Sequence, residues 1–229
     1  MHGAPADFLA ETSGAPCVVR EALMVTVEVD PVRVESRLAA GELSCPSCPD
    51  GVLARWGFGR SRRVVGLEDP VRPRRSRCRG CAATHVLLPV SLLLRRAYAA
   101  EVIWAVLEAR AAGVGHRRIA AAAGIPACTV RRWLRVLGRR VEAVRQWFIG
   151  VAVTAGVEVA IPPATGTGVG DVLAAVGAAR ESIVARFGPE QVLGAVTAVG
   201  AAVACSGARL LSPGWPPASG WVAPTPVAL

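Results

Sequence analysis

Hydrophobic and polar residues alternate over residues 23–29. Because successive side chains of a strand point to opposite faces, this alternation predicts a short strand. Residues 32–40 have helical spacing and are followed by Gly41, which predicts one short helix. We therefore expect residues 23–44 to form a strand and a helix that lead into the next segment. Residues 1–22 are mostly small and polar and are expected to be disordered.

The next segment, residues 45–92, has a different composition. It is rich in Arg, Gly and Pro, with short β-prone stretches at 56–58, 63–67 and 84–88. These stretches offer too little apolar bulk for a self-supporting core. Some other interaction must therefore hold this segment together.

Apolar residues recur with helical spacing over residues 95–148, and Gly113, Gly115 and Gly124 interrupt the pattern. These interruptions predict three helices. Residues 149–170, which contain two prolines and several glycines, are expected to form a linker.

The C-terminal part is rich in Ala and Val. It predicts a helical pair within residues 171–210, with helices near 171–187 and 189–204. Residues 211–229 are rich in Pro and are expected to form a loose tail.

Four of the seven cysteines form two CxxC pairs, Cys45 with Cys48 and Cys78 with Cys81. Two intervening residues let both thiolates of a pair approach one metal ion, and two pairs supply the closed tetrahedral sulfur set of a Zn²⁺ site. Four thiolates leave no coordination position for water, so we expect the Zn²⁺ to be structural. Residues 45–92 are then a four-cysteine zinc ribbon.

Two other interpretations of the cysteine pairs are a redox site and chance spacing. A redox CxxC follows a strand and opens a helix, whereas both pairs here lie in turns rich in Gly, Pro and Arg. His85 lies four residues after Cys81 and can replace a thiolate, but four cysteines already complete the ligand set. We therefore expect His85 to be an ordinary strand residue.

Positive charge is concentrated in the middle of the chain, whose formal net charge is +9. Residues 45–97 hold eleven arginines against three acidic residues, and residues 98–148 hold nine against three. Such a surface attracts a polyanion because its cations displace condensed counterions. All 26 basic residues are arginine, and GC-rich codons explain this usage without selection for guanidinium chemistry.

Arginines between the two cysteine pairs are interleaved with Trp56 and Phe58. One interpretation is a solvated basic face over two core aromatics. The other is a basic ribbon that lies along a phosphate backbone. In that interpretation the phosphate contacts are Arg62, Arg63, Arg74 and Arg75.

Residues 116–135 fill the packing positions of a helix-turn-helix. Ile119 and Ala120 supply an apolar and a small residue where two helices cross closely, and Gly124 follows where a tight turn needs a positive φ. Ile125 can lie under that turn. The stripe that packs the second helix is then Val130, Trp133 and Leu134.

The outward side of that second helix, 127–137, is expected to enter the major groove of DNA. Arg can bond guanine O6 and N7 with two N–H groups, and Thr can contact a phosphate or a thymine methyl. The expected base-reading residues are Thr129, Arg131, Arg132 and Arg135. Which arginine reads a base and which holds a phosphate stays open at this point. Arg117 and Arg118 are expected to contact backbone phosphates.

The fold class predicted from these elements is mainly α with a small β zinc ribbon. A three-helix helix-turn-helix domain at 95–148 is followed by C-terminal helices.

Three stretches of the chain resemble a family of uncharacterised zinc-ribbon plus helix-turn-helix proteins of high-GC bacteria, often associated with insertion sequences. The stretches are LAAGELSCPSC at 38–48, RCRGCAATHVLLP at 77–89 and TVRRWL at 129–134. The resemblance covers about residues 25–150, and the N-terminal DNA-binding regions of many transposases look similar. It implies DNA-end binding or regulation, and the family has no known activity that could be carried over to this chain.

The main alternative function is that of an enzyme, a transposase with its own strand-transfer site. That chemistry uses carboxylates on separate elements to hold two metal ions. After Gly150 only four acidic residues remain, on Ala-rich segments, and no Ser/His/Asp set, phosphate-binding loop or HExxH helix is found. We therefore expect no enzymatic activity, while a catalytic domain on another chain stays open.

A membrane anchor is a second alternative, because residues 192–208 carry no charge. This stretch is at the short limit for a span and is dominated by Ala, Gly and small polar residues. We expect a buried or dimerising helix there, so a membrane partner is not expected.

The expected function is sequence-specific binding of double-stranded DNA, as a transcriptional regulator or a mobile-element accessory protein. The alternative is the non-catalytic DNA-end-binding part of a transposase system. Other expected partners are a second copy of the chain and the transposase or transcription machinery. An odd number of cysteines and an N-terminus without a signal-peptide pattern predict a cytoplasmic, nucleoid-associated protein.

Overall fold

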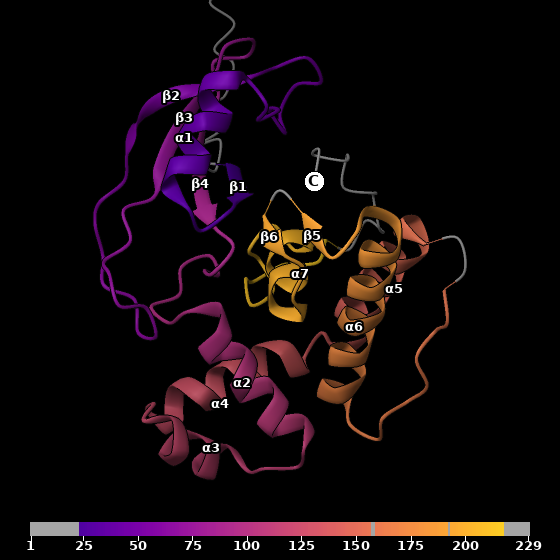
Figure 1. Ribbon diagram of the computed structural model, residues 1–229. Coiled ribbons are helices and arrows are strands. Elements are labelled where there is room, and N and C mark those ends of the chain that lie inside the picture. The colour runs from indigo at the N-terminus through magenta and orange to yellow at the C-terminus, as the bar shows by residue number, and fades with distance from the viewer. Residues whose placement is uncertain (1–22, 157–158, 192, 218–229) are drawn as a thin grey trace, which may run out of the picture.

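The computed structural model describes residues 23–156, 159–191 and 193–217. Over these residues the fold is α/β, with seven helices, a small four-stranded sheet and a two-stranded hairpin (Figure 1). The expectations for residues 1–22, and for the end of the tail from residue 218, lie outside the described residues.

The sheet has the strand order β1-β4-β3-β2. β1 pairs in parallel with β4, and the other two pairings are antiparallel. Residues 63–67, which the sequence marks as β-prone, lie instead in the long connection between β2 and β3. The strands are β1 (Leu23–Val27), β2 (Leu53–Phe58), β3 (Arg74–Cys78) and β4 (Thr84–Pro89).

The strand and the helix expected within residues 23–44 are both present, and both pack with the strands that follow. β1 lies at the edge beside β4, and α1 (Pro31–Ala40) packs against the strands. Together they complete a small core that residues 45–92 cannot build alone. Its buried residues are Val25, Val27, Val34, Leu38, Leu43, Cys45, Leu53, Cys78 and Leu87.

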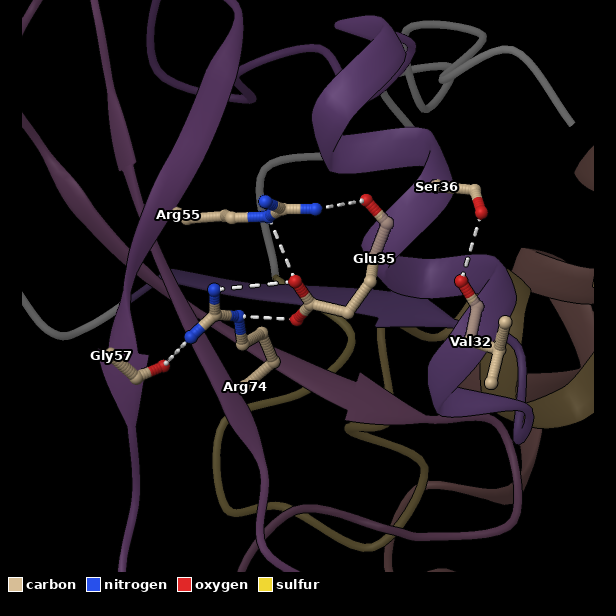
Figure 2. A network of polar contacts seen from close by, with 6 residues as sticks. All are labelled: Val32, Glu35, Ser36, Arg55, Gly57 and Arg74. Atoms are coloured by element: carbon tan, nitrogen blue, oxygen red, sulfur yellow. Dashed lines mark hydrogen bonds and ion pairs between the residues drawn. The ribbon is translucent and has the colours of Figure 1, made fainter.

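Ion pairs fix α1 on the sheet. The carboxylate of Glu35 lies 2.8 Å from Nε of Arg55 on β2 and 2.6 Å from Nε of Arg74 on β3 (Figure 2). Glu28 is buried just after β1 and pairs with Arg37 of α1 at 2.9 Å. Because a buried carboxylate without a partner is strongly destabilising, this second pair constrains where α1 sits.

Residues 95–155 form four helices, where the sequence predicted three over 95–148. Gly138 ends α4, and α5 continues well into the expected linker. The reason is that Phe148, Ile149 and Ala152 continue a buried face against α6. The four helices are α2 (Ala100–Ala111), α3 (His116–Ala123), α4 (Ala127–Gly138) and α5 (Val141–Ala155).

The C-terminal part contains α6 (Gly168–Phe187), the hairpin strands β5 (Glu190–Gln191) and β6 (Gly194–Ala195), and α7 (Ala198–Cys205). A helix was predicted over residues 189–204, but its first part forms the hairpin and only α7 is helical. α6 lies along α5, and its small residues bury a continuous face there. In α7, which lies in the stretch expected to form a buried or dimerising helix, Ala202 and Val203 are buried in the helical core.

The expectation of a loose tail is wrong as far as residue 217. Leu211 and Trp215 are buried. The Trp215 ring contacts the ring of Trp147 edge-on, with centroids 5.4 Å apart, and Arg140 donates a hydrogen bond to the Trp215 carbonyl. These large apolar side chains hold the segment against α5 despite its prolines.

The connection between β2 and β3 joins the sheet to the helices. Val64 from this connection is buried in the helical core. The N–H of Val65 donates to the Ala97 carbonyl, and the N–H of Ala99 donates to the Val65 carbonyl. Gly66, with φ +94°, packs so closely on α2 that a Cβ would lie 2.5 Å from a Val102 methyl. The sheet and α2 are therefore held in a fixed relation.

No helix of the described part of the chain combines the length and apolar character needed to cross a bilayer.

Candidate metal centre and basic helical surface

The four cysteines of the two CxxC pairs meet at one end of the sheet. Cys45 and Cys48 lie in the turn before β2, Cys78 ends β3, and Cys81 lies in the turn before β4. Antiparallel pairing places Leu53 opposite Cys78 and so brings the two turns together.

The geometry of the sulfurs suits a single metal ion. The four Sγ atoms lie within 4.8 Å of one another. Cys45 and Cys81 are 3.7 Å apart at Sγ, and Cys48 and Cys78 are 3.5 Å apart. A tetrahedron with metal–sulfur bonds of about 2.3 Å has edges of about 3.8 Å. These four residues, as the spacing predicts, can therefore hold a metal ion.

Backbone N–H groups also point at the sulfurs. The N–H of Ser47 donates to Cys45 Sγ, and those of Gly80 and Cys81 donate to Cys78 Sγ, all at 3.3–3.4 Å. Burial opposes ionisation of Cys78, but hydrogen bonds from these N–H groups and from the neighbouring thiols together lower its pKa to about 7. Such donors spread the negative charge of bound thiolates.

Cys45 and Cys48 have raised pKa values and resist ionisation when no cation is bound. A hydrogen bond with Cys78, together with burial, raises the pKa of Cys48 to about 12, and burial raises the pKa of Cys45. Four thiolates this close repel one another, so a cation is needed for all of them to ionise. The cluster has the chemistry of a metal centre.

Gly51 also belongs to this candidate site, although its role was not predicted from the sequence. A Cβ at this position would lie 2.3 Å from Cys48 Sγ and 2.5 Å from Cys78 Sγ. Only glycine lets the backbone approach the sulfurs this closely. A glycine soon after the first CxxC pair is a sequence signal that could have drawn attention to it.

His85 has a closer relation to the cluster than expected. It is completely buried on β4, and its Nε2 lies 3.3 Å from Cys45 Sγ. The four sulfurs complete the tetrahedron, so we assign His85 to support of a ligand and not to ligation. A ring N–H that donates to Cys45 orients the thiolate and reduces its charge.

The helices α3 and α4 are joined by a tight turn at the other end of the molecule (Figure 1). Ile119 and Ala120 are buried, and Gly124 ends α3 with φ +64°. The N–H of Ile125 donates to the Ala120 carbonyl at 3.0 Å, and Ile125 itself is buried under the turn. On α4 the deeply buried residues are Val130, Trp133 and Leu137, whereas Leu134, which the sequence placed in this stripe, is half-buried.

The residues expected to contact DNA from these helices lie at the surface. Thr129 is half-buried, and the arginines are exposed at positions 117, 118, 131, 132 and 135. No acidic residue occurs between Glu108 and Glu142 in the sequence. Burial and the nearby positive charge of Arg132 lower the pKa of Arg96. Positive charge therefore accumulates here.

A cleft of about 520 Å³ lies beside α4. Arg131 and Arg135 line one side of it, and Arg110 and His116 contribute from α2 and α3. The start of α6, at Gly168, closes another side. The cleft brings together three arginines and a histidine from parts of the chain that the sequence did not connect.

The four arginines of residues 45–92 that were expected to contact phosphate differ in solvent exposure and in whether they form an ion pair. Arg63 and Arg75 are exposed, and Arg62 is half-buried. Arg74 is paired with Glu35 and donates to the Gly57 carbonyl at 2.9 Å (Figure 2). Its guanidinium holds α1 on the sheet, and we remove it from the expected phosphate contacts.

Residues 45–133 match the model of a family described as a domain of unknown function, DUF6431. The matched region starts at the first cysteine of the cluster and ends in α4, so it includes the metal centre and the α3–α4 turn. No curated protein and no solved structure matches the chain. The matched region therefore spans both the cysteine cluster and the turn between α3 and α4.

Replacing Gly51 with alanine is expected to disrupt the metal centre. The new Cβ would collide with Cys48 and Cys78, so Gly51→Ala should lower the affinity for Zn²⁺ used as a probe by about tenfold or more. Competition with a chromophoric chelator measures this. Gly80→Ala is the matched control, because a Cβ at that position makes only ordinary contacts with sulfur, at 3.5 Å or more. Equal affinities of the two variants would contradict the assignment of Gly51.

A second prediction concerns His85. His85→Ala removes the donor to Cys45 and should weaken metal binding by about tenfold in the same chelator competition. His85→Gln can place an amide N–H near the position of Nε2 and should restore most of the affinity. If both variants bind like the unmodified protein, then His85 does not support the ligand.

Proposed function

We propose that the protein binds double-stranded DNA in a sequence-specific manner, with α3 and α4 acting as a helix-turn-helix and with a structural Zn²⁺ in the four-cysteine cluster. The observation that carries this proposal is the exposed arginine face of α4, presented by a helix that packs through a glycine turn onto α3. The role is that of a transcriptional regulator or a mobile-element accessory protein, without catalytic activity of its own.

The packing of α2, α3 and α4 supports the proposal. Buried Ile119 and Ala120 let α4 cross α3 closely, and the buried stripe of Val130, Trp133 and Leu137 turns the opposite side of α4 to solvent. A helix supported in this way can enter a major groove with its exposed side chains toward the base edges.

The charges support a nucleic-acid partner. Among the described residues, none of the arginines of α3 or α4 forms an ion pair, so their charge is not neutralised within the chain. Phosphates satisfy such cations and release counterions.

The surroundings of the α4 arginines suggest different roles for them. Arg131 and Arg135 open into the cleft with Arg110 and His116, an arrangement that suits a backbone phosphate. Arg132 is exposed and does not line that cleft. We therefore assign Arg132 to base reading, and Arg131 and Arg135 to phosphate contacts beside it.

Zinc is the metal that best fits the donor set. Four thiolates in a closed tetrahedron are typical of structural Zn²⁺ and leave no open position for substrate. The metal would hold β2, β3 and β4 together at one end of the sheet.

The purified protein is expected to contain one equivalent of Zn²⁺. Cys78→Ser removes one of the four ligands and should abolish stoichiometric zinc, as measured by elemental mass spectrometry. Cys128→Ser is the control, because Cys128 is exposed on α4, away from the cluster. A full equivalent of zinc in Cys78→Ser would disprove the four-cysteine site.

Selection of bound sequences from a random duplex library tests DNA recognition directly. The zinc-loaded protein should enrich a sequence motif at near-physiological salt, where purely ionic binding is suppressed. If no motif is enriched, α3 and α4 do not read sequence, and the proposal fails.

With the selected duplex, Arg132→Ala is expected to weaken binding by about 1–3 kcal/mol, because a bidentate contact with a base is lost. Fluorescence anisotropy with the selected duplex and a scrambled one measures the effect. Arg33→Ala removes an exposed arginine of α1, with the same change in net charge, and should leave the preference for the selected duplex unchanged. An unchanged preference in Arg132→Ala would exclude Arg132 from the reading face.

A further inference from the structure

Two aromatic side chains on β2 are unusually exposed. Trp56 is 52% exposed and Phe58 is 49% exposed. The interpretation in which they form a core under the arginines is therefore wrong. Aromatic side chains usually stabilise a fold because their rings are buried. These two rings, two residues apart on an edge strand, contribute little stability of that kind.

Local backbone geometry presents Trp56 outward. The register between β2 and β3 shifts between Arg55 and Gly57, so Trp56 is the extra residue of a β-bulge and has no partner opposite it on β3. β2 is also the edge strand, so no further strand covers this side of the sheet. A bulge of this kind re-aims a side chain and interrupts strand pairing.

Arginines are stacked over both rings. The guanidinium of Arg77 lies 4.7 Å from the Trp56 ring centroid, and those of Arg74 and Arg72 lie 4.3 and 4.9 Å from that of Phe58. Backbone carbonyls orient these side chains: Arg77 Nε donates to Ala82 at 3.2 Å, and Arg72 Nε donates to Gly59 at 3.4 Å. Together the two rings and the three guanidiniums form an aromatic–arginine strip.

Such a strip matches one ligand chemistry. An unpaired base can stack on an aromatic ring or a guanidinium plane, and the phosphate that follows it is attracted by the neighbouring arginine. A duplex offers its phosphates but keeps its bases stacked internally, so it cannot use the rings. An acidic peptide would use the charge but has few flat groups to stack.

We propose that Trp56 and Phe58, with Arg72 and Arg77, form a stacking platform for the unpaired bases of single-stranded DNA. The choice of DNA over RNA rests on the proposed function, in which the ligand of α4 is duplex DNA. The stacking argument itself uses none of the α3 or α4 residues, so its test is separate from that of the helix-turn-helix.

Binding of labelled oligonucleotides to the full, zinc-loaded protein tests this proposal. Fluorescence anisotropy is measured with oligo-dT of about 12 nucleotides, a length suited to a single platform, with oligo-U of the same length, and with a duplex. Trp56→Ala should weaken oligo-dT binding by about tenfold and leave duplex binding within about twofold, because only the unpaired bases use the ring. Trp56→Phe should keep most of the oligo-dT affinity.

The chain offers a matched control. Phe187 is 46% exposed, with the Arg186 guanidinium 5.2 Å from its ring centroid, but it lies at the end of α6. Phe187→Ala should not change oligo-dT binding, which separates the platform from exposed cation–ring pairs in general. An equal loss in Phe187→Ala and Trp56→Ala would overturn the proposal.

Trp56→Leu keeps apolar bulk at the bulge while removing the aromatic face, and it replaces the alanine variant if that variant loses its zinc. Unchanged oligo-dT binding by Trp56→Leu overturns the proposal, and so does a parallel loss of oligo-dT and duplex binding. A tenfold preference for oligo-U would assign the platform to RNA and overturn the choice of DNA. Failure of Arg132→Ala to affect duplex recognition bears only on α4.

Discussion

The sheet depends on the convergence of four cysteine sulfurs within 4.8 Å. This constraint accounts for details that otherwise have no reason. Gly51 must lack a side chain so that its backbone can pass over the sulfurs, and N–H groups of the turns must point at Cys45 and Cys78. Because the thiols cannot all ionise next to one another, the arrangement calls for a cation. A metal bound here would hold β2, β3 and β4 together at this end of the sheet.

The second constraint is the attachment of this sheet to the helices. Val64 enters the helical core from the β2–β3 connection, and Val65 exchanges backbone hydrogen bonds with residues 97 and 99 just before α2. The connection that follows the proposed platform on β2 therefore packs on the helices that carry the proposed duplex-binding face. A nucleic acid with paired and unpaired portions is the kind of ligand that could engage both.

Charge alone does not identify the arginines that bind a ligand. Arg74 and Arg75 are adjacent in the sequence, yet Arg74 is used to hold Glu35 of α1 whereas Arg75 is exposed. Likewise, Arg131 and Arg135 share a cleft with Arg110 and His116, which come from other helices. Each distinction depends on what packs next to a side chain, and a linear pattern of charges does not contain that information.

The sequence by itself determined the four candidate metal ligands, the strand and helix before them, and the α3–α4 turn. These features are local: CxxC spacing, two-residue alternation, and a glycine that needs a positive φ each act over a few residues. Only the tertiary structure decided that β1 pairs with β4, that Gly51 and His85 adjoin the cysteines, and that α5 and the tail to residue 217 pack into the core. It also decided that Trp56 and Phe58 are exposed. These outcomes depend on contacts between residues that are distant in the chain. The free energy of each such contact depends on the packing of the whole fold, so no short stretch of sequence predicts it.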